Sequence, residues 1–288
     1  MIKIKTAEEI ELMREPCRIT RDVLDLLGKS VKEGMTTAAL DKIAFAFIKD
    51  CGAEPAFLGY YGYPASTCIS LDDMVVHGIP NEKSVIAPDM IISVDVGAVK
   101  NGFVGDAARS FYVGEISPEK KKLIDVTREC FFEAVKDLRD GTPLGDIGYN
   151  VQKHAEENGF SVVREMVGHG VGREMHEDPS VPNFGKKGTG IRLKKGMTIA
   201  IEPMINMGQR YVKFLSDGWG VATKDGMPSA HYENTVLITA DGAEMYLRMK
   251  KFERRTGAPF AYWIEPSIVA LIRGLAHDDA ETRGPSAC

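Results

Sequence analysis

The feature that most constrains the fold is a hairpin signal in DMIISVDVGAVKNGFVGDAARSF, residues 89–111. Asn101-Gly102 lies between two runs rich in Val, Ile and Phe, and a type I′ turn needs positive φ at both central residues, which Asn and Gly adopt readily. Each strand carries one aspartate, Asp95 or Asp106. Counting outward from a two-residue loop predicts the facing pairs, which are Lys100 with Phe103, Gly97 with Asp106, and Asp95 with Ala108.

The two aspartates are predicted to lie on one face of the hairpin. Side chains alternate between faces, so Asp95, Gly97 and Asp106 point the same way, and the acids are diagonal neighbours. A hairpin whose acids face water is the simplest alternative, but apolar residues on both faces favour burial. Because buried carboxylates repel each other, a cation is needed between them, either an arginine or a divalent metal.

The rest of the chain predicts an α+β fold built from two similar halves. A capping box at Thr6 opens a helix over 7–27, and a second helix covers 37–50. After strands from 67 to 113 the pattern restarts, with helices over 118–140 and 144–158, and strands follow again. Both halves set two glycines eighteen positions apart, which are Gly34 with Gly52 and Gly141 with Gly159. We expect each half to place two helices on a mostly antiparallel sheet, with the site in the cleft between the halves.

Composition excludes several classes of protein. A net charge of −5 without a basic stripe argues against a nucleic-acid partner. The chain lacks an apolar signal segment and any run near the roughly 18 apolar residues of a membrane span, so we expect a cytoplasmic protein with no membrane contact. Five cysteines without a CxxC motif indicate reduced thiols.

Further metal ligands are predicted in the second half. Glu202 ends an apolar strand in GMTIAIEPMI, Glu233 opens a strand in AHYENTVLIT, and His169 lies between two glycines in VREMVGHGVGREMHEDP. Together with Asp95 and Asp106 they form a set of four carboxylates and one imidazole. A charge of −4 balances two divalent ions, and metal binding lowers the pKa of water toward about 7.

These motifs together resemble the type I methionine aminopeptidases. The resemblance covers about residues 3–248 and rests on the hairpin DVGAVKNGFVGDAARSF, on GHGVG with His176 seven residues after His169, on IEP and on YEN. It implies the pita-bread fold, a curved, mostly antiparallel sheet with helices and two pseudo-symmetric halves. The catalytic domain would span 1–250, with halves of about 1–115 and 116–250, and 251–288 would be a C-terminal extension.

The resemblance implies a dinuclear metal centre that removes the initiator methionine from nascent chains when the second residue is small. One ion would be held by Asp106, His169, Glu202 and Glu233, and the other by Asp95, Asp106 and Glu233. The ligand set accepts manganese, iron, cobalt or zinc. In the reaction, Glu202 would move protons, His176 would stabilise the tetrahedral oxyanion, and His77 would contact the scissile nitrogen.

The methionine pocket is also assigned by resemblance. The matching positions are Tyr60, Tyr63, Cys68 and Trp219, and aromatic walls suit a thioether. His77 and His176 would contact the substrate as well. Two positions depart from the best-known bacterial pattern, since Phe57 stands where cysteine is common and Met175 where phenylalanine is usual. Both keep the site apolar and could reshape the pocket.

Three alternatives stay open. A proline-specific peptidase of this fold has similar ligands but usually carries an extra N-terminal domain. A binding protein on this fold would have lost its metals, whereas this chain has all five ligands. Cys68 with His77 as a nucleophilic pair lacks a third orienting group.

Two hypotheses concern the role of the C-terminal extension. Residues 251–288 are expected to be a packing extension, and the sharper hypothesis is a transient contact with the ribosome. We expect a monomer.

Overall fold

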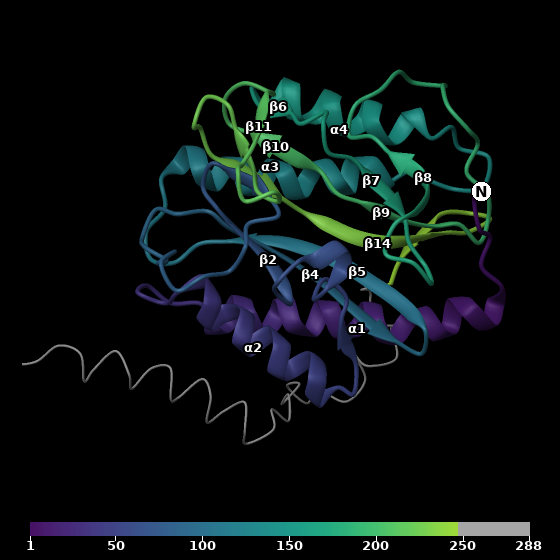
Figure 1. Cartoon of the computed structure of the whole chain (residues 1–288). Coiled ribbons are helices and arrows are strands. Elements are labelled where there is room, and N and C mark those ends of the chain that lie inside the picture. Colours follow the sequence, from purple (N-terminus) through teal and green to yellow (C-terminus); the bar gives the residue numbers. More distant parts are fainter. Residues whose placement is uncertain (247–288) are drawn as a thin grey trace, which may run out of the picture.

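The structure is a computed structural model that describes residues 1–246, so the extension over 251–288 lies outside the described residues. A pair of helices precedes each of two runs of strands along the chain, and Figure 1 shows one helix pair on each side of the strands of the main sheet. The predicted combination of helices with an antiparallel sheet is confirmed.

The first helix pair matches the prediction closely. Helix α1 (Ala7–Ser30) starts at a capping box, in which the Thr6 side chain accepts from the Glu9 backbone and Glu9 accepts from Thr6. It runs three residues past the predicted end at 27. Helix α2 (Thr37–Asp50) has the predicted bounds and is capped by Thr36.

The second helix pair contains one wrong boundary. Helix α3 (Pro118–Val135) ends five residues before the predicted end at 140, and α4 (Gly145–Glu157) agrees within one residue. The backbone N–H of Asp140 donates to Thr239, and that of Gly141 donates to Leu193. Because these donors bind neighbouring segments instead of the preceding helical turn, the helix stops earlier.

The main sheet has nine strands in the order β1-β4-β5-β14-β9-β7-β8, with β2 beside β4 and β15 beside β14. All of its strand pairs are antiparallel. Its strands are β1 (Glu54–Pro55), β2 (Thr67–Leu71), β4 (Ile92–Lys100), β5 (Phe103–Phe111), β7 (Gly168–Gly170), β8 (Glu177–Val181), β9 (Thr198–Ile201), β14 (Glu233–Ile238) and β15 (Ala243–Met245).

Two three-stranded sheets and a short 3₁₀ turn complete the described elements. One sheet has the order β13-β10-β6 and the other β11-β12-β3. The elements are β3 (Met74–Val76), β6 (Ser161–Val162), β10 (Met204–Asn206), β11 (Val212–Phe214), β12 (Val221–Thr223), β13 (Ser229–His231) and η1 (Tyr60–Gly62).

The hairpin has the predicted register. Asn101 and Gly102 have φ of 56° and 74°, as a type I′ turn requires. Asp95 faces Ala108 and Gly97 faces Asp106, so both acids lie on one face. Helix α1 packs across β5, where the position of Gly105 would place a Cβ 2.4 Å from the Cys17 nitrogen.

Apolar clusters attach the helices to the sheet. Helices α1 and α2 pack against β2 and β4, and α3 and α4 pack against β9, β10 and β14. No helix in residues 1–246 is long and apolar enough to cross a membrane. The four cysteines in this range are free, as predicted.

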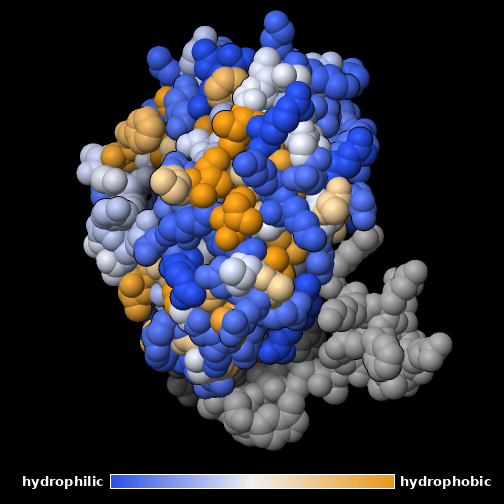
Figure 2. All heavy atoms as spheres, turned by 90° about the vertical axis from the view of Figure 1, so that its right-hand side faces the viewer, coloured by the Kyte–Doolittle hydropathy of each residue, from blue (hydrophilic) through white to orange (hydrophobic). Residues whose placement is uncertain are grey.

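The N-terminal segment is fixed beside the strand that follows His176. Lys5 and Glu177 form a buried ion pair of 2.5 Å, and the Lys5 N–H donates to the carbonyl of Gly196. Figure 2 shows the face that carries the N-terminus, where apolar side chains gather within a mostly hydrophilic surface. A groove in this region is lined by Ile2, Ile4, Ile191, Arg192, Lys194 and Met197.

Candidate metal centre and active site

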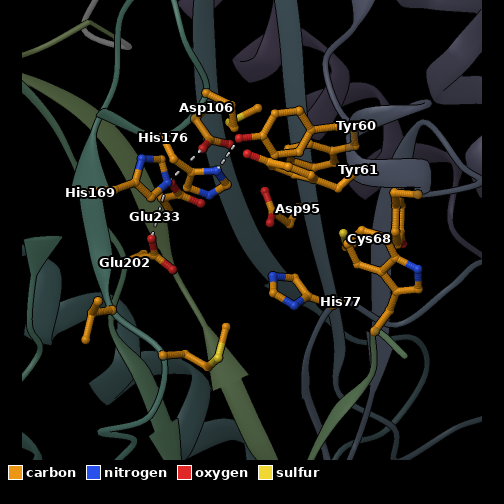
Figure 3. A pocket seen from close by; sticks show the side chains of 16 residues that line it. Tyr60, Tyr61, Cys68, His77, Asp95, Asp106, His169, His176, Glu202 and Glu233 are labelled. Atoms are coloured by element: carbon orange, nitrogen blue, oxygen red, sulfur yellow. Dashed lines mark hydrogen bonds and ion pairs between the residues drawn. The ribbon is translucent and has the colours of Figure 1, made fainter. Parts of the chain in front are cut away.

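A cavity of about 230 Å³ brings together every residue that the sequence assigned to the site. Figure 3 shows one side of it with Asp106, His169, His176, Glu202 and Glu233, the other side with Tyr60, Tyr61 and Cys68, and Asp95 and His77 between the two. The predicted residues that line it are Phe57, Tyr60, Tyr63, Cys68, His77, Asp95, Asp106, His169, Met175, His176, Glu202, Trp219 and Glu233.

We call the five predicted metal ligands the carboxylate wall: Asp95, Asp106, His169, Glu202 and Glu233. Strand register explains why they converge. Ala108 of β5 faces Asp95 on one side and Glu233 on the other, and Asp106 lies two residues along the same face. On the next strands, His169 faces Ala200 and Ile201 faces Asn234, which places Glu202 on that face too.

The imidazole of His169 lies among the acids with its orientation fixed by contacts of both nitrogens. Its Nε2 is 3.5 Å from Asp106 Oδ2 and 3.6 Å from Glu202 Oε1. Its Nδ1 is 2.9 Å from the carbonyl oxygen of Gly170, which can only accept, so Nδ1 carries the proton. Nε2 therefore faces the carboxylates and is the nitrogen that could ligate a metal, as in metal-ligating histidines, whose other nitrogen usually donates to a carbonyl or carboxylate.

Three oxygens of the buried acids have no hydrogen-bond partner among the described residues. Asp95 Oδ1, Asp106 Oδ1 and Glu233 Oε1 are buried without a hydrogen bond in the described part of the chain. Burial, followed by the charge of Asp106, raises the pKa of both Asp95 and Glu233 well above the ordinary range. Burial raises the pKa of Glu202 to about 8, although His169 opposes the shift. Without a cation the wall therefore retains protons.

A divalent metal fits this donor set. Ligand atoms of Asp106, His169 and Glu233 lie within 4.8 Å of one another. Carboxylate oxygens and an imidazole suit first-row divalent ions, and the orphaned oxygens would gain the cation that they lack. Among the described residues no arginine side chain lines the cavity, and Arg109, whose charge acts on Glu233, donates to the backbone carbonyl of Glu233 and to the Asn234 side chain instead of lying between the carboxylates.

Two further histidines face the carboxylate wall. His176 lies beside His169, with ring centroids 4.3 Å apart, and its Nδ1 is 2.9 Å from the Tyr60 hydroxyl. Burial, with the neighbouring His169 and His77, lowers the pKa of His176 to about 4. Burial also lowers the pKa of His77, whose backbone has a positive φ of 60°. Both imidazoles are therefore neutral at pH 7.

We call Phe57, Tyr60, Tyr63 and Trp219 the aromatic wall. Tyr63 and Trp219 meet edge to face at 5.0 Å, and the single hydrogen of the Tyr63 hydroxyl is shared between the carbonyls of Thr67 and Gly78, each 3.1 Å away. These bonds fix the wall to the start of β2 and to the loop after His77. The result is an apolar surface opposite the acids.

Phe57 and Met175, the two departures from the bacterial pattern, both lie next to Gly97. A Cβ at Gly97 would lie 2.7 Å from Met175 Cε and 2.8 Å from Phe57 Cε1. The absent side chain at position 97 therefore leaves room for both. Their side chains stay apolar neighbours, as expected.

Cys68 is not suited to act as a nucleophile. Burial, then the charge of Asp95, raises the pKa of its thiol well above the ordinary range. Because the thiolate is the reactive form, a buried neutral thiol beside carboxylates is unreactive. This electrostatic setting argues against the alternative Cys68–His77 pair.

Some residues near the site were not assigned from the sequence. Tyr61, Met166 and Val167 also line the cavity. His231 is 2% exposed, and its Nε2 lies 3.9 Å from both Glu202 Oε2 and Glu233 Oε2. Its place two residues before Glu233 is the only sequence signal that could have indicated this contact.

Comparison with known proteins gives consistent matches. The pattern of metallopeptidase family M24 matches residues 11–240. A methionine aminopeptidase of Clostridium acetobutylicum is 51% identical over 245 residues, which cover 85% of this chain and 98% of the relative. Methionine aminopeptidase 1 of Bacillus subtilis is 46% identical over 249 residues, covering 86% of this chain and 100% of the relative.

A solved structure agrees with these relatives. The crystal structure of a methionine aminopeptidase from Thermotoga maritima superposes with a TM-score of 0.85 at 44% identity. The match covers 86% of this chain and 100% of that chain. With the antiparallel sheet order, this likeness confirms the predicted pita-bread fold.

Proposed function

The chain belongs to metallopeptidase family M24, and from this premise we propose how its cavity performs the removal of N-terminal methionine. It is a metal-dependent aminopeptidase that removes the initiator methionine. The proposal concerns the number of ions, the residues that act and the preference for a small second residue. One observation carries it: five potential ligands lie on one face of adjacent strands, with buried carboxylate oxygens that lack partners.

Two divalent ions would occupy the carboxylate wall. Four carboxylates supply −4, which two divalent ions neutralise. Asp106, His169, Glu202 and Glu233 would hold one ion, and Asp95, Asp106 and Glu233 the other. Manganese, iron, cobalt and zinc all suit these donors. When bound, the ions supply a water of lowered pKa for attack on the carbonyl carbon of the first residue.

Three side chains act around the reacting bond. Glu202, within 3.6 Å of His169, would accept a proton from the attacking water and return it to the leaving amine. The neutral His176 would donate a hydrogen bond to the developing oxyanion. His77 would contact the nitrogen of the scissile bond from the opposite side of the cavity.

The aromatic wall would bind the methionine side chain. Its rings, with Cys68, surround an apolar space next to Asp95, and thioethers make favourable contacts with rings. A cavity of about 230 Å³ is smaller than the roughly 300–1,000 Å³ of sites for drug-sized ligands. We propose that this space admits methionine together with a small second residue.

We also propose a cellular setting for this reaction. The substrates would be nascent peptides in the cytoplasm, met by a monomer that binds neither nucleic acid nor membranes. For residues 251–288 there are two hypotheses. The simpler one is a packing extension, and the sharper one is a transient contact with the ribosome.

Methionine release tests the proposal. We would compare Met-Ala-Ser with Met-Leu-Ser, using metal-stripped protein with and without Mn²⁺, and count bound ions by elemental analysis. Release should require metal and favour the alanine peptide. Glu202→Gln should lower kcat by about 10²–10⁴-fold, as loss of a general acid–base group does, whereas Glu115→Gln, at an exposed acid away from the site, should not.

Each outcome of this experiment tests a different part of the proposed function. No release with any divalent metal would favour the binding-protein alternative. Equal release from both peptides would contradict the size preference. One ion per chain at full activity would contradict the dinuclear centre.

A further inference from the structure

The feature that carries the inference is the hydrogen bond between Tyr60 and His176. The Tyr60 hydroxyl lies 2.9 Å from His176 Nδ1, and the two rings are tilted by 34° with centroids 5.5 Å apart. Figure 3 shows the hydroxyl pointing to the imidazole above Asp95. One nitrogen of His176 is therefore engaged by Tyr60, which leaves Nε2 for the substrate.

The direction of this hydrogen bond follows from the acidity and basicity of the two groups. A neutral imidazole has one N–H and one nitrogen lone pair, and a hydroxyl can donate or accept. The imidazole nitrogen, with an ordinary pKa near 6.5, is far more basic than a phenol oxygen, and a phenol, with a pKa near 10, is a good donor. The favoured arrangement has Tyr60 donating to Nδ1.

The position of the hydroxyl is fixed by the turn that carries Tyr60. The Tyr60 N–H donates to Phe57, the Tyr63 N–H donates to Tyr60, and the Gly59 N–H donates to Tyr63. Tyr61 packs edge to face on the Tyr60 ring at 4.7 Å. The turn therefore closes on itself and holds the phenol in one place.

We infer that Tyr60 is a positioning residue that holds His176 in the tautomer with the proton on Nε2. With Nδ1 accepting from Tyr60, Nε2 must carry the hydrogen and can donate to a carbonyl oxygen. The other tautomer would present a lone pair to that oxygen and repel it. A hydroxyl that orients a catalytic imidazole through its second nitrogen follows the same logic as the aspartate of serine proteases. The inference rests on the proposed role of His176.

Nitrogen NMR tests the tautomer without using activity. Protein labelled with ¹⁵N at histidine would be studied with Zn²⁺ bound, and the His176 signals assigned by their loss in His176→Gln. In wild type, the Nε2 of His176 should be protonated and Nδ1 should not. Tyr60→Phe, which keeps the ring, should shift these signals toward a mixture of tautomers, whereas Tyr211→Phe, at a half-exposed tyrosine outside the cavity, should not.

Kinetics then separates positioning from pocket shape. Tyr60→Phe should lower kcat roughly tenfold, the size expected for one neutral hydrogen bond, with KM changed less than about twofold because the ring stays. In the His176→Gln background, where an amide N–H replaces the imidazole, Tyr60→Phe should have little further effect.

Two results would overturn the inference. A proton on Nδ1 of His176 in wild type would show that Tyr60 accepts, and an unchanged tautomer and kcat in Tyr60→Phe would show that the hydroxyl is not needed. Absence of methionine release by the wild type would instead contradict the proposed function, and the wild-type tautomer would still decide whether Tyr60 donates.

Discussion

The two walls of the cavity are built from different kinds of structure. The carboxylate wall lies on or directly after β4, β5, β7, β9 and β14, which form a continuous antiparallel ladder. The aromatic wall comes from segments outside the main sheet, with Tyr60 in a 3₁₀ turn and Trp219 between two short strands. Strand ladders hold side chains more precisely than loops do, and metal coordination needs that precision.

The energies of the two walls also depend on different physical interactions. Acids in the carboxylate wall are buried without enough partners, so their energy depends on a cation and on pH. The aromatic wall has satisfied hydroxyls and apolar contacts, so its energy depends on shape. Changes to each wall should therefore have different signatures.

Removal of metal should make the stability depend on pH through the carboxylate wall. Glu202 has a pKa of about 8 in the fold against 4.5 for the free side chain, so the folded metal-free protein holds a proton that the unfolded chain releases. Stability therefore falls as pH rises between these values. Burial lowers the pKa of His169, but the hydrogen bond to Asp106 and the nearby carboxylate charges outweigh burial and raise this pKa to about 9. His169 therefore changes the stability in the same direction as Glu202 does.

Between pH 6.5 and 8.5, we expect metal-stripped protein to lose at least about 2 kcal/mol of unfolding free energy, measured by urea denaturation. Glu202→Gln should reduce this loss, and Asp241→Asn, at an exposed acid, should leave it unchanged. Metal-loaded protein should be much less sensitive. If the unfolding free energy of the metal-stripped protein did not change with pH, the carboxylate wall would not make stability depend on pH, and the two walls would not differ in this respect.

Gly97 marks the place where the walls meet, and Gly97→Ala should strain both. The new Cβ would lie within 2.8 Å of Met175, Ala56 and Phe57, which is closer than packed carbons come. We expect a loss of about 1–3 kcal/mol in unfolding free energy, typical of overpacking.

Because Met175 supplies the nearest atom, Met175→Val should recover part of that loss, with a coupling of about 1 kcal/mol. Gly242→Ala is the matched control, since a Cβ there meets nothing within 4 Å. Additive effects of Gly97→Ala and Met175→Val would show that the contact is relieved elsewhere.

The carboxylate wall was the more predictable of the two. The Asn-Gly turn determines the register of its hairpin, and the register determines the face of Asp95 and Asp106. Glu202 and Glu233 could be placed at strand ends from the apolar runs beside them. Pairing of β9 with β14 joins residues more than thirty positions apart, which a single sequence does not specify, so the convergence of all ligands came from charge balance and resemblance.

The aromatic wall could not be predicted from residue patterns. Loop residues have no periodicity, so Tyr60, Tyr63 and Trp219 were assigned by resemblance alone. Tyr61 was missed because its backbone has a positive φ of 47°, a turn geometry without a local signal. His231 reaches Glu202 and Glu233 from β13, which belongs to a separate sheet, so its contact depends on how the two sheets stack.

Trp219→Leu should change substrate binding without changing metal content, which sharpens the contrast between the walls. Trp219 meets Tyr63 edge to face at 5.0 Å, and such pairs contribute about 0.5–1.5 kcal/mol beyond their buried area. We expect KM for Met-Ala-Ser to rise roughly three- to tenfold, with kcat and bound metal nearly unchanged. Phe214→Leu, at an aromatic residue that is 69% exposed, is the matched control and should leave KM unaltered. If Trp219→Leu also lost metal, the aromatic wall would be supporting the carboxylate wall, and the two could no longer be treated as independent parts of one site.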